Sequence, residues 1–131
     1  MNRTYGLLRE FGNFVIAHMH QTGYSSENIL YEWARVGEMG KTQGALDEDG
    51  FLIGRDKILC VDMPNHLQKV EIALRKISDL REKCVRMWFC APLREDGQFY
   101  TKSQMARILR INKGKFKAEL KKGQKDLEIL L

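Results

Sequence analysis

The residues whose type and spacing point most directly to chemistry are basic side chains near the C-terminal end of the chain. Residues 101–131 contain nine Lys or Arg and three Asp or Glu, so they carry 9 − 3 = +6. The chain of 131 residues carries +5 in total, which leaves 5 − 6 = −1 for residues 1–100. The nine basic residues are Lys102, Arg107, Arg110, Lys113, Lys115, Lys117, Lys121, Lys122 and Lys125. Cationic groups confined to one segment favour binding to phosphates, such as those of a nucleic-acid backbone.

Catalytic chemistry has no comparable pattern in this chain. His18, His20 and His66 are scattered, and the sequence has no CxxC, HExxH, GxSxG or GxxxxGK[ST] motif. The cysteines are odd in number and lie in apolar surroundings, which is typical of reduced core thiols in a cytosolic chain. They are Cys60, Cys84 and Cys90. We therefore expect no enzymatic activity, no cofactor and no metal.

A second charged feature is the acidic run Asp47-Glu48-Asp49 before Gly50, within the glycine-containing segment 37–54. A calcium loop would need ligands spaced over about 12 residues and a bidentate Glu at the end, and that series is missing. An acidic surface turn is therefore the favoured interpretation. A loop this long in a small domain is often functional, so it is also a candidate partner-binding arm.

Two helices and a turn would position the basic side chains. Thr101 and Gln104 have the spacing of a capping box, which begins a helix. Residues 110–112 form a turn, and Asn112 is a good N-cap for a second helix. Apolar residues at helical spacing mark one face of each helix. These residues are Met105, Ala106, Ile108 and Leu109 in the first helix, and Phe116, Leu120, Gly123 and Leu127 in the second.

A short helix, a tight turn and a basic second helix match the geometry that places a recognition helix in the major groove of DNA. The run 105–127 also resembles the helix-turn-helix in the DNA-binding C-terminal region of bacterial sigma factors. The matching residues are Ala106, Ile111, Lys113, Gly114, Phe116, Leu120 and Leu127. The run departs from the sigma pattern at Arg110, where Gly is usual, and at Gly123, where Ala is common.

The predicted DNA contacts lie around the start of the second helix. Side chains there usually reach the groove, and Asn112 or the Gly114 backbone could bind a phosphate with help from the helix dipole. Arg107 and Arg110 would straddle the DNA backbone. The predicted DNA-binding residues are Lys102, Arg107, Arg110, Asn112, Lys113, Gly114, Lys115, Lys117 and Lys121. The alternative for the lysine run is a solvated helix face.

The rest of the chain also reads as mainly helical, with helices predicted over 3–20, from Ser25 or Ser26 to about 36, from 63 to 77 and over 80–91. Asp62 would cap the third helix with Pro64 in its first turn. Its apolar seam, for which intramolecular packing is favoured over self-association, is Met63, Leu67, Val70, Leu74 and Ile77. Asp79 and Glu82 would form a capping box for the fourth helix. Segments 51–53 and 58–61 are either short strands or extended core segments.

The predicted fold class is therefore mainly α: a small helical domain with a C-terminal sigma-like helix-turn-helix and an irregular glycine-containing middle loop. We expect one domain, 1–131, made of N-terminal helices and loop (1–61) and a helical DNA-binding part (62–131) with the helix-turn-helix at 101–131. No apolar run reaches the ~20 residues of a membrane span, and no signal peptide is evident. We expect a cytoplasmic protein.

In its wider layout the chain resembles the late-gene antitermination (Q-type) regulators of lambdoid phages, in particular those without a zinc finger. The basic sigma-like motif, the N-terminal aromatic helix pair and the acidic middle loop carry this resemblance. It implies a bacterial host, binding to double-stranded DNA near a late promoter, and loading onto RNA polymerase, with or without its sigma factor. Residues 1–61 would then face the polymerase, and transcription would resist pausing and termination.

Two alternatives from other classes remain open on the sequence alone. A DNA-packaging protein, such as a small terminase subunit, also pairs a helix-turn-helix with an oligomerising helix, here 63–77. A protein-interaction module would instead use the basic helix to bind an acidic partner and would not bind DNA at moderate salt. The sequence leaves the oligomeric state open.

Overall fold

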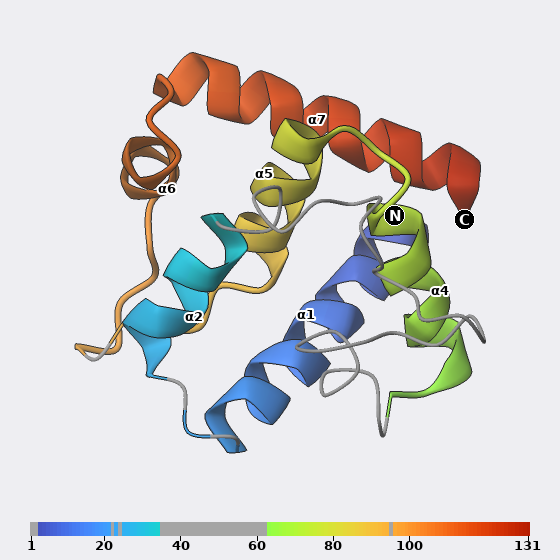
Figure 1. Ribbon diagram of the computed structural model, residues 1–131, viewed down its shortest axis with the longest axis horizontal. Coiled ribbons are helices and arrows are strands. Elements are labelled where there is room, and N and C mark those ends of the chain that lie inside the picture. The colour runs from blue at the N-terminus through green and yellow to red at the C-terminus, as the bar shows by residue number, and fades with distance from the viewer. Residues whose placement is uncertain (1–2, 22, 24, 35–62, 95) are drawn as a thin grey trace, which may run out of the picture.

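The computed structural model describes residues 3–21, 23, 25–34, 63–94 and 96–131, and these residues form six helices (Figure 1). The helices are α1 (Arg3–Gln21), α2 (Ser26–Ala34), α4 (Asn65–Leu74), α5 (Asp79–Phe89), α6 (Lys102–Ile108) and α7 (Lys113–Leu130). The described residues contain no strand. The predicted mainly α class is confirmed.

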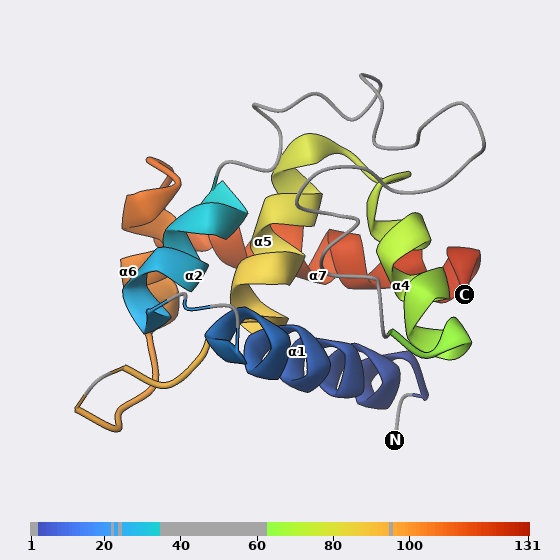
Figure 2. The same cartoon turned by 60° about the horizontal axis from the view of Figure 1, so that its bottom comes forward.

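Helix α5 lies at the centre of the fold and packs against α7, α1, α2 and α6 (Figure 1). Helix α7 spans one side of the molecule and also contacts α6, α1 and α4. Figure 2 shows α1 at the front, with α7 behind the other helices. Trp33 of α2 is buried, and its Nε1 donates a hydrogen bond to the Cys90 carbonyl oxygen at 2.9 Å, which joins α2 to the end of α5.

The first two helices follow the predicted pattern. Leu8, Phe11 and Val15 of α1 are buried, as are Ile29 and Leu30 of α2. Ser25, one of the two predicted serines, caps α2: its Oγ accepts a hydrogen bond from the Asn28 backbone N–H at 3.2 Å. The loop at 37–54, its acidic turn, segments 51–53 and 58–61, and the Cys60 thiol lie outside the described residues.

Helix α4 (Asn65–Leu74) begins two residues later and ends three residues earlier than the predicted range of 63–77. Pro64 is the N-cap, with ψ 149°, and is not in the first turn; its carbonyl accepts the backbone N–H groups of Leu67 and Gln68. Asp62, the predicted cap, lies outside the described residues. The five predicted seam residues, Met63, Leu67, Val70, Leu74 and Ile77, are all buried within the chain. Their burial supports intramolecular packing over self-association through this seam.

The predicted capping box of α5 is wrong. Ser78 is the N-cap and Asp79 is already the first helical residue, while the helix ends at Phe89, before the predicted Ala91. The Glu82 side chain is buried instead of returning to the helix end. It accepts a hydrogen bond from the Nε of Arg86, one turn later, at 2.9 Å. Glu82 pairs with Arg86 and does not cap the helix, because an unpaired buried guanidinium would cost far more free energy than the loss of a solvent-exposed cap.

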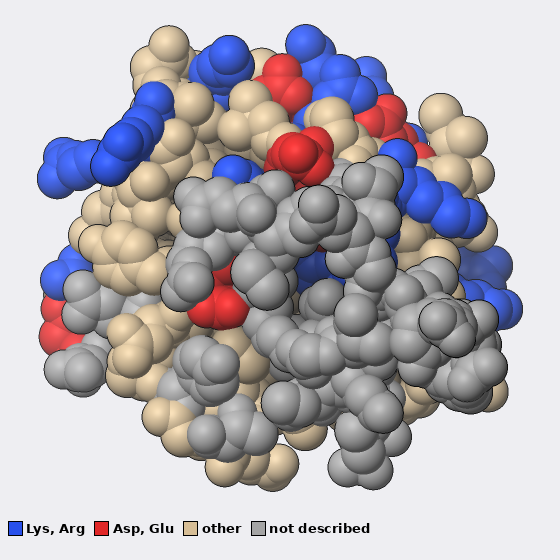
Figure 3. All heavy atoms as spheres, viewed as in Figure 1, with Lys and Arg blue, Asp and Glu red and all other residues tan. Residues whose placement is uncertain are grey.

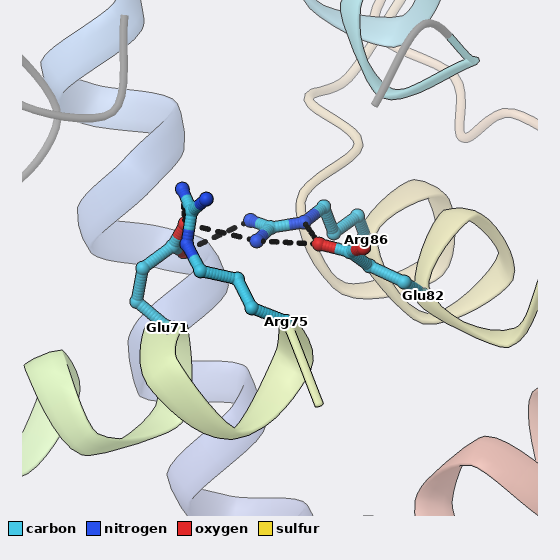
Figure 4. A network of polar contacts seen from close by, with 4 residues as sticks. All are labelled: Glu71, Arg75, Glu82 and Arg86. Carbon is cyan, nitrogen blue, oxygen red and sulfur yellow. Dashed lines mark hydrogen bonds and ion pairs between the residues drawn. The ribbon is translucent and has the colours of Figure 1, made fainter. Parts of the chain in front are cut away.

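Arg86 is the centre of a buried polar network that joins α4 to α5 (Figure 4). Its Nη1 and Nη2 donate to the two carboxylate oxygens of Glu71, both at 2.9 Å, in a bidentate pair. Arg75 donates to the same carboxylate at 2.9 Å. Burial disfavours the charged form of Glu71, but the two arginines outweigh it and lower the pKa of this carboxyl below its ordinary value. The network therefore stays charged and links the two helices.

Helix α7 buries the predicted narrow face. Phe116, Leu120, Gly123 and Leu127 are all buried against the core. At Gly123 an added Cβ would lie 2.8 Å from the Cγ2 of Val85 on α5, which is tighter than ordinary carbon contacts. This close approach favours glycine at position 123, because a larger residue would push α7 away from α5.

Candidate nucleic-acid interface

Helices α6 and α7 both begin at side-chain caps. The Thr101 Oγ1 accepts the Gln104 N–H at 3.1 Å, and the Gln104 Oε1 accepts the Thr101 N–H at 2.8 Å, so the predicted capping box is confirmed. Asn112 accepts the Lys115 N–H at 2.7 Å and is the N-cap of α7, as predicted. Asn112 is exposed, so its cap lies at the open, positive end of the α7 dipole.

The turn between the two helices is a Schellman motif. The Ile111 N–H donates to the Ala106 carbonyl at 3.0 Å, and the Arg110 N–H donates to the Arg107 carbonyl at 3.1 Å. Arg110 occupies the left-handed position of this motif, with φ 60°. Gly normally fills that position, because a side chain there is strained. Arg110 therefore lowers the stability of the turn relative to Gly, while it places an exposed guanidinium there.

Replacing Arg110 with Gly should raise the free energy of unfolding by roughly 0.5–1 kcal/mol, because it relieves the left-handed strain. The matched control is Arg107→Gly, inside α6, which should lower stability by about 1 kcal/mol. Urea unfolding followed by circular dichroism measures both changes. A loss of stability in Arg110→Gly would mean that the Arg110 side chain stabilises the turn by more than its backbone strain costs.

The lysines of α7 fall on two flanks of its exposed surface. With about 3.6 residues per turn, Lys113, Lys117 and Lys121 form one line along the helix, and Lys115 and Lys122 lie on the opposite flank. All five side chains are exposed. Figure 3 shows basic side chains along the edge formed by α7, with acidic ones between them. This arrangement presents ammonium groups on both sides of the helix axis.

Small residues lie between these two flanks. Gly114 and Ala118 are exposed and one turn apart, and Lys125 continues the same line. An added Cβ on Gly114 would meet only the Oδ1 of Asn112, at 3.4 Å, so packing inside the protein does not require glycine there. Small side chains at the centre and lysines at the rims allow close approach of a nucleic-acid groove to the first turns of α7.

Two of the three acidic residues of α7 pair with an arginine of the neighbouring helix α5. Arg81 of α5 donates to Glu119 at 3.1 Å and to Asp126 at 2.6 Å, which pins the inner flank of α7. These hydrogen bonds raise the pKa of Arg81 above its ordinary value. In the described part of the chain, the six α7 lysines make one ion pair, between Lys122 and Glu119 at 3.9 Å. The remaining lysines are available to an external anion.

The other predicted contact residues divide between two places. Arg107 and Arg110 are exposed on α6 and the turn, near the start of α7. Lys102, at the start of α6, is directed onto Trp88 of α5, with its Nζ 4.7 Å from the ring centroid. The structure thus brings eight of the nine predicted residues together around the turn and α7. Lys125 was counted in the sequence charge but not among the predicted contacts, and the structure places it on the same exposed face, four residues after Lys121 and seven after Ala118.

The described residues contain no cluster of three or more His, Cys, Asp or Glu that could hold a metal ion. Cys84 and Cys90 are free and buried, and burial raises the pKa of each thiol to about 12. Both are therefore neutral thiols at neutral pH, in line with the predicted core role. In the described segments, none of the helices has the length and apolarity to cross a membrane.

Comparison with known proteins adds no relative: no family model, curated protein or solved structure matches the chain.

Proposed function

We propose that this protein is a sequence-specific transcription regulator that binds double-stranded DNA by placing the first turns of α7 in the major groove. One observation carries the proposal: the lysines of α7 are exposed and almost free of intramolecular ion pairs, on a helix that follows a Schellman turn and an exposed Asn112 cap. Lysine side chains bind phosphates more readily than they distinguish base edges. Sequence recognition would therefore depend on the side chains that lie closest to the bases in the major groove.

Within this class, we propose a late-gene antiterminator that acts on bacterial RNA polymerase. The support for this finer role is the resemblance in layout to the Q-type phage regulators. The packaging alternative is weakened, because the helix it needs for oligomerisation has its apolar seam buried within the chain. The alternative of a protein-interaction module predicts no DNA binding at moderate salt, whereas the proposal predicts that the protein binds DNA there.

Selection of bound fragments from random and genomic DNA at ~150 mM salt tests the proposal, because weak non-specific contacts are mostly lost there. A recovered consensus supports a specific regulator. If the consensus lies near phage late promoters, pull-down of RNA polymerase with the promoter fragment tests antitermination. Recovery of fragments without any shared sequence would contradict specific regulation.

Reversing the charges of Lys113 and Lys117 to Glu should weaken DNA binding by ~100-fold or more, because it replaces two phosphate contacts with repulsion. The matched control reverses Lys69 and Lys76, which are also exposed but lie on and just after α4. Both variants have the same net charge, 5 − 4 = +1. Fluorescence anisotropy over a salt series measures affinity. Equal weakening in both variants would show that only net charge matters and that α7 is not the interface.

A further inference from the structure

A groove lies on the side of the molecule away from α7. It has a volume of about 360 Å³ and is formed by α1, the end of α5, segment 91–100 and α6. Ile16, Trp88, Leu93 and Met105 give it apolar walls, and Phe99 stands at its edge. None of the described residues that line the groove belongs to α7, so the groove and the lysine face are separate surfaces. Figure 2 shows α1 at the front and α7 behind the other helices.

An ordered turn holds Phe99 in the solvent. The Gly97 N–H donates to the Arg94 carbonyl at 2.9 Å, and the Arg94 N–H donates to the Gln98 carbonyl at 2.8 Å. Phe99, directly after this turn, is 80% exposed, and Leu93, directly before it, is 47% exposed. Burying a large apolar side chain is favourable, because it removes apolar surface from water. Two such side chains fixed in water beside an apolar groove are typical of an interaction site.

Among the described residues the charge at the groove is positive, because Asp96 of the adjoining turn is paired with Arg94 at 3.5 Å. Arg9 is the charged residue among the described side chains that line it. Lys102 does not line the groove itself, but its Nζ lies 4.7 Å from the ring centroid of Trp88, which does. The neighbouring carboxylate on α1, Glu10, is paired with His66 at 2.8 Å and does not line the groove. A complementary ligand therefore carries negative charge beside its apolar groups.

We propose that this groove docks a segment of a partner protein that presents a large apolar side chain flanked by carboxylates. The apolar side chain packs on Trp88 and Phe99, and the carboxylates pair with Arg9 and Lys102. A second copy of this chain and DNA are the other occupants that the test must distinguish. The proposal does not rest on DNA binding, and it leaves the lysine face of α7 free for a second ligand.

The test is selection from a displayed library of random ~12-residue peptides, followed by titration of the enriched peptide. We expect a consensus with one or two large apolar residues next to Asp or Glu. Phe99→Ala and Arg9→Glu should each weaken this peptide at least ~10-fold, because hot-spot contacts dominate such interfaces. Phe99 is exposed, so its replacement should leave the circular dichroism melt unchanged. The Lys113→Glu, Lys117→Glu variant should bind the peptide like the wild type.

Four results would overturn the proposal. The first is an absence of enrichment, or a basic consensus. The second is peptide binding lost in the Lys113→Glu, Lys117→Glu variant and kept in Phe99→Ala, which would assign acidic peptides to α7. The third is a sedimentation result in which the wild type is a dimer and Phe99→Ala a monomer, which would make the occupant a second copy. The fourth is a loss of DNA affinity in Phe99→Ala, which would make the groove part of the nucleic-acid interface.

Discussion

Replacing Gly12 with Ala should lower the free energy of unfolding by ~3–4 kcal/mol or more, the range of severe core defects. Gly12 lies where α1 crosses the end of α5, and an added Cβ would lie 1.8 Å from the carbonyl oxygen of Phe89. The obstacle is backbone, so it cannot move aside as a flexible side chain would. Relief requires α1 to shift away from α5, which opens the core that the two helices share.

The control for this prediction lies on the same helix. Gly6 is exposed, and an added Cβ there would meet nothing within 4 Å. Gly6→Ala should therefore raise stability by ~0.5–1 kcal/mol through helix propensity alone. Urea unfolding measures both variants. If Gly12→Ala were also stabilising, α1 and α5 could not cross at Gly12.

Replacing Arg86 with Met should cost ~3–5 kcal/mol, because it leaves buried carboxylates without their main partner. Glu71 and Glu82 are each 1% exposed, and Arg86 bonds to both. The matched variant Glu71→Leu, Glu82→Leu, Arg86→Met removes the three fully buried charges together and leaves Arg75, whose side chain is 16% exposed. It should recover much of the loss, since apolar replacement of buried charges as a set is often nearly neutral. A triple variant less stable than Arg86→Met would mean that the network is worth more than its desolvation cost.

The single variant Arg86→Met should also reverse the pH dependence of stability. In the wild type the pKa of Glu71 is lowered, so its contribution is present above the ordinary carboxyl pKa of about 4.3 and is lost as pH falls below it. Without Arg86, burial becomes the larger influence and raises the pKa of Glu71. Stability of Arg86→Met should therefore fall as pH rises from about 4.3 toward 7. Unfolding curves at several pH values measure this, and parallel pH profiles would contradict it.

If both proposals hold, the protein has two working surfaces on opposite sides of one core. The lysine face of α7 would hold DNA, while the groove beside Phe99 would hold an acidic partner segment. Helix α5 connects them, because it contacts α7 on one side and contributes Trp88 to the groove on the other. A regulator of transcription needs this kind of separation, so that one surface stays bound to DNA while the other recruits a protein.

Local sequence determined the positions of the helices and the side-chain caps of α6 and α7. The Thr101–Gln104 box, the Asn112 cap and the buried face at Phe116 depend on residues three or four apart, and such spacings fix helix starts and apolar faces before any tertiary contact forms. The local charge of α7 is equally a property of the sequence. For the same reason the mainly α class and the helix-turn-helix turn could be predicted.

Tertiary structure alone decided which polar groups are used inside and which remain for ligands. Glu82 has the spacing of a helix cap, yet it pairs with Arg86 because a buried guanidinium across from Glu71 needs a second carboxylate. Lys102 belongs to the basic segment, yet it lies on Trp88, and Phe99 is left exposed by a turn that local spacing does not describe. Arg86 and Glu71, for example, are 15 residues apart in the sequence. A pattern of near neighbours carries no information about such contacts.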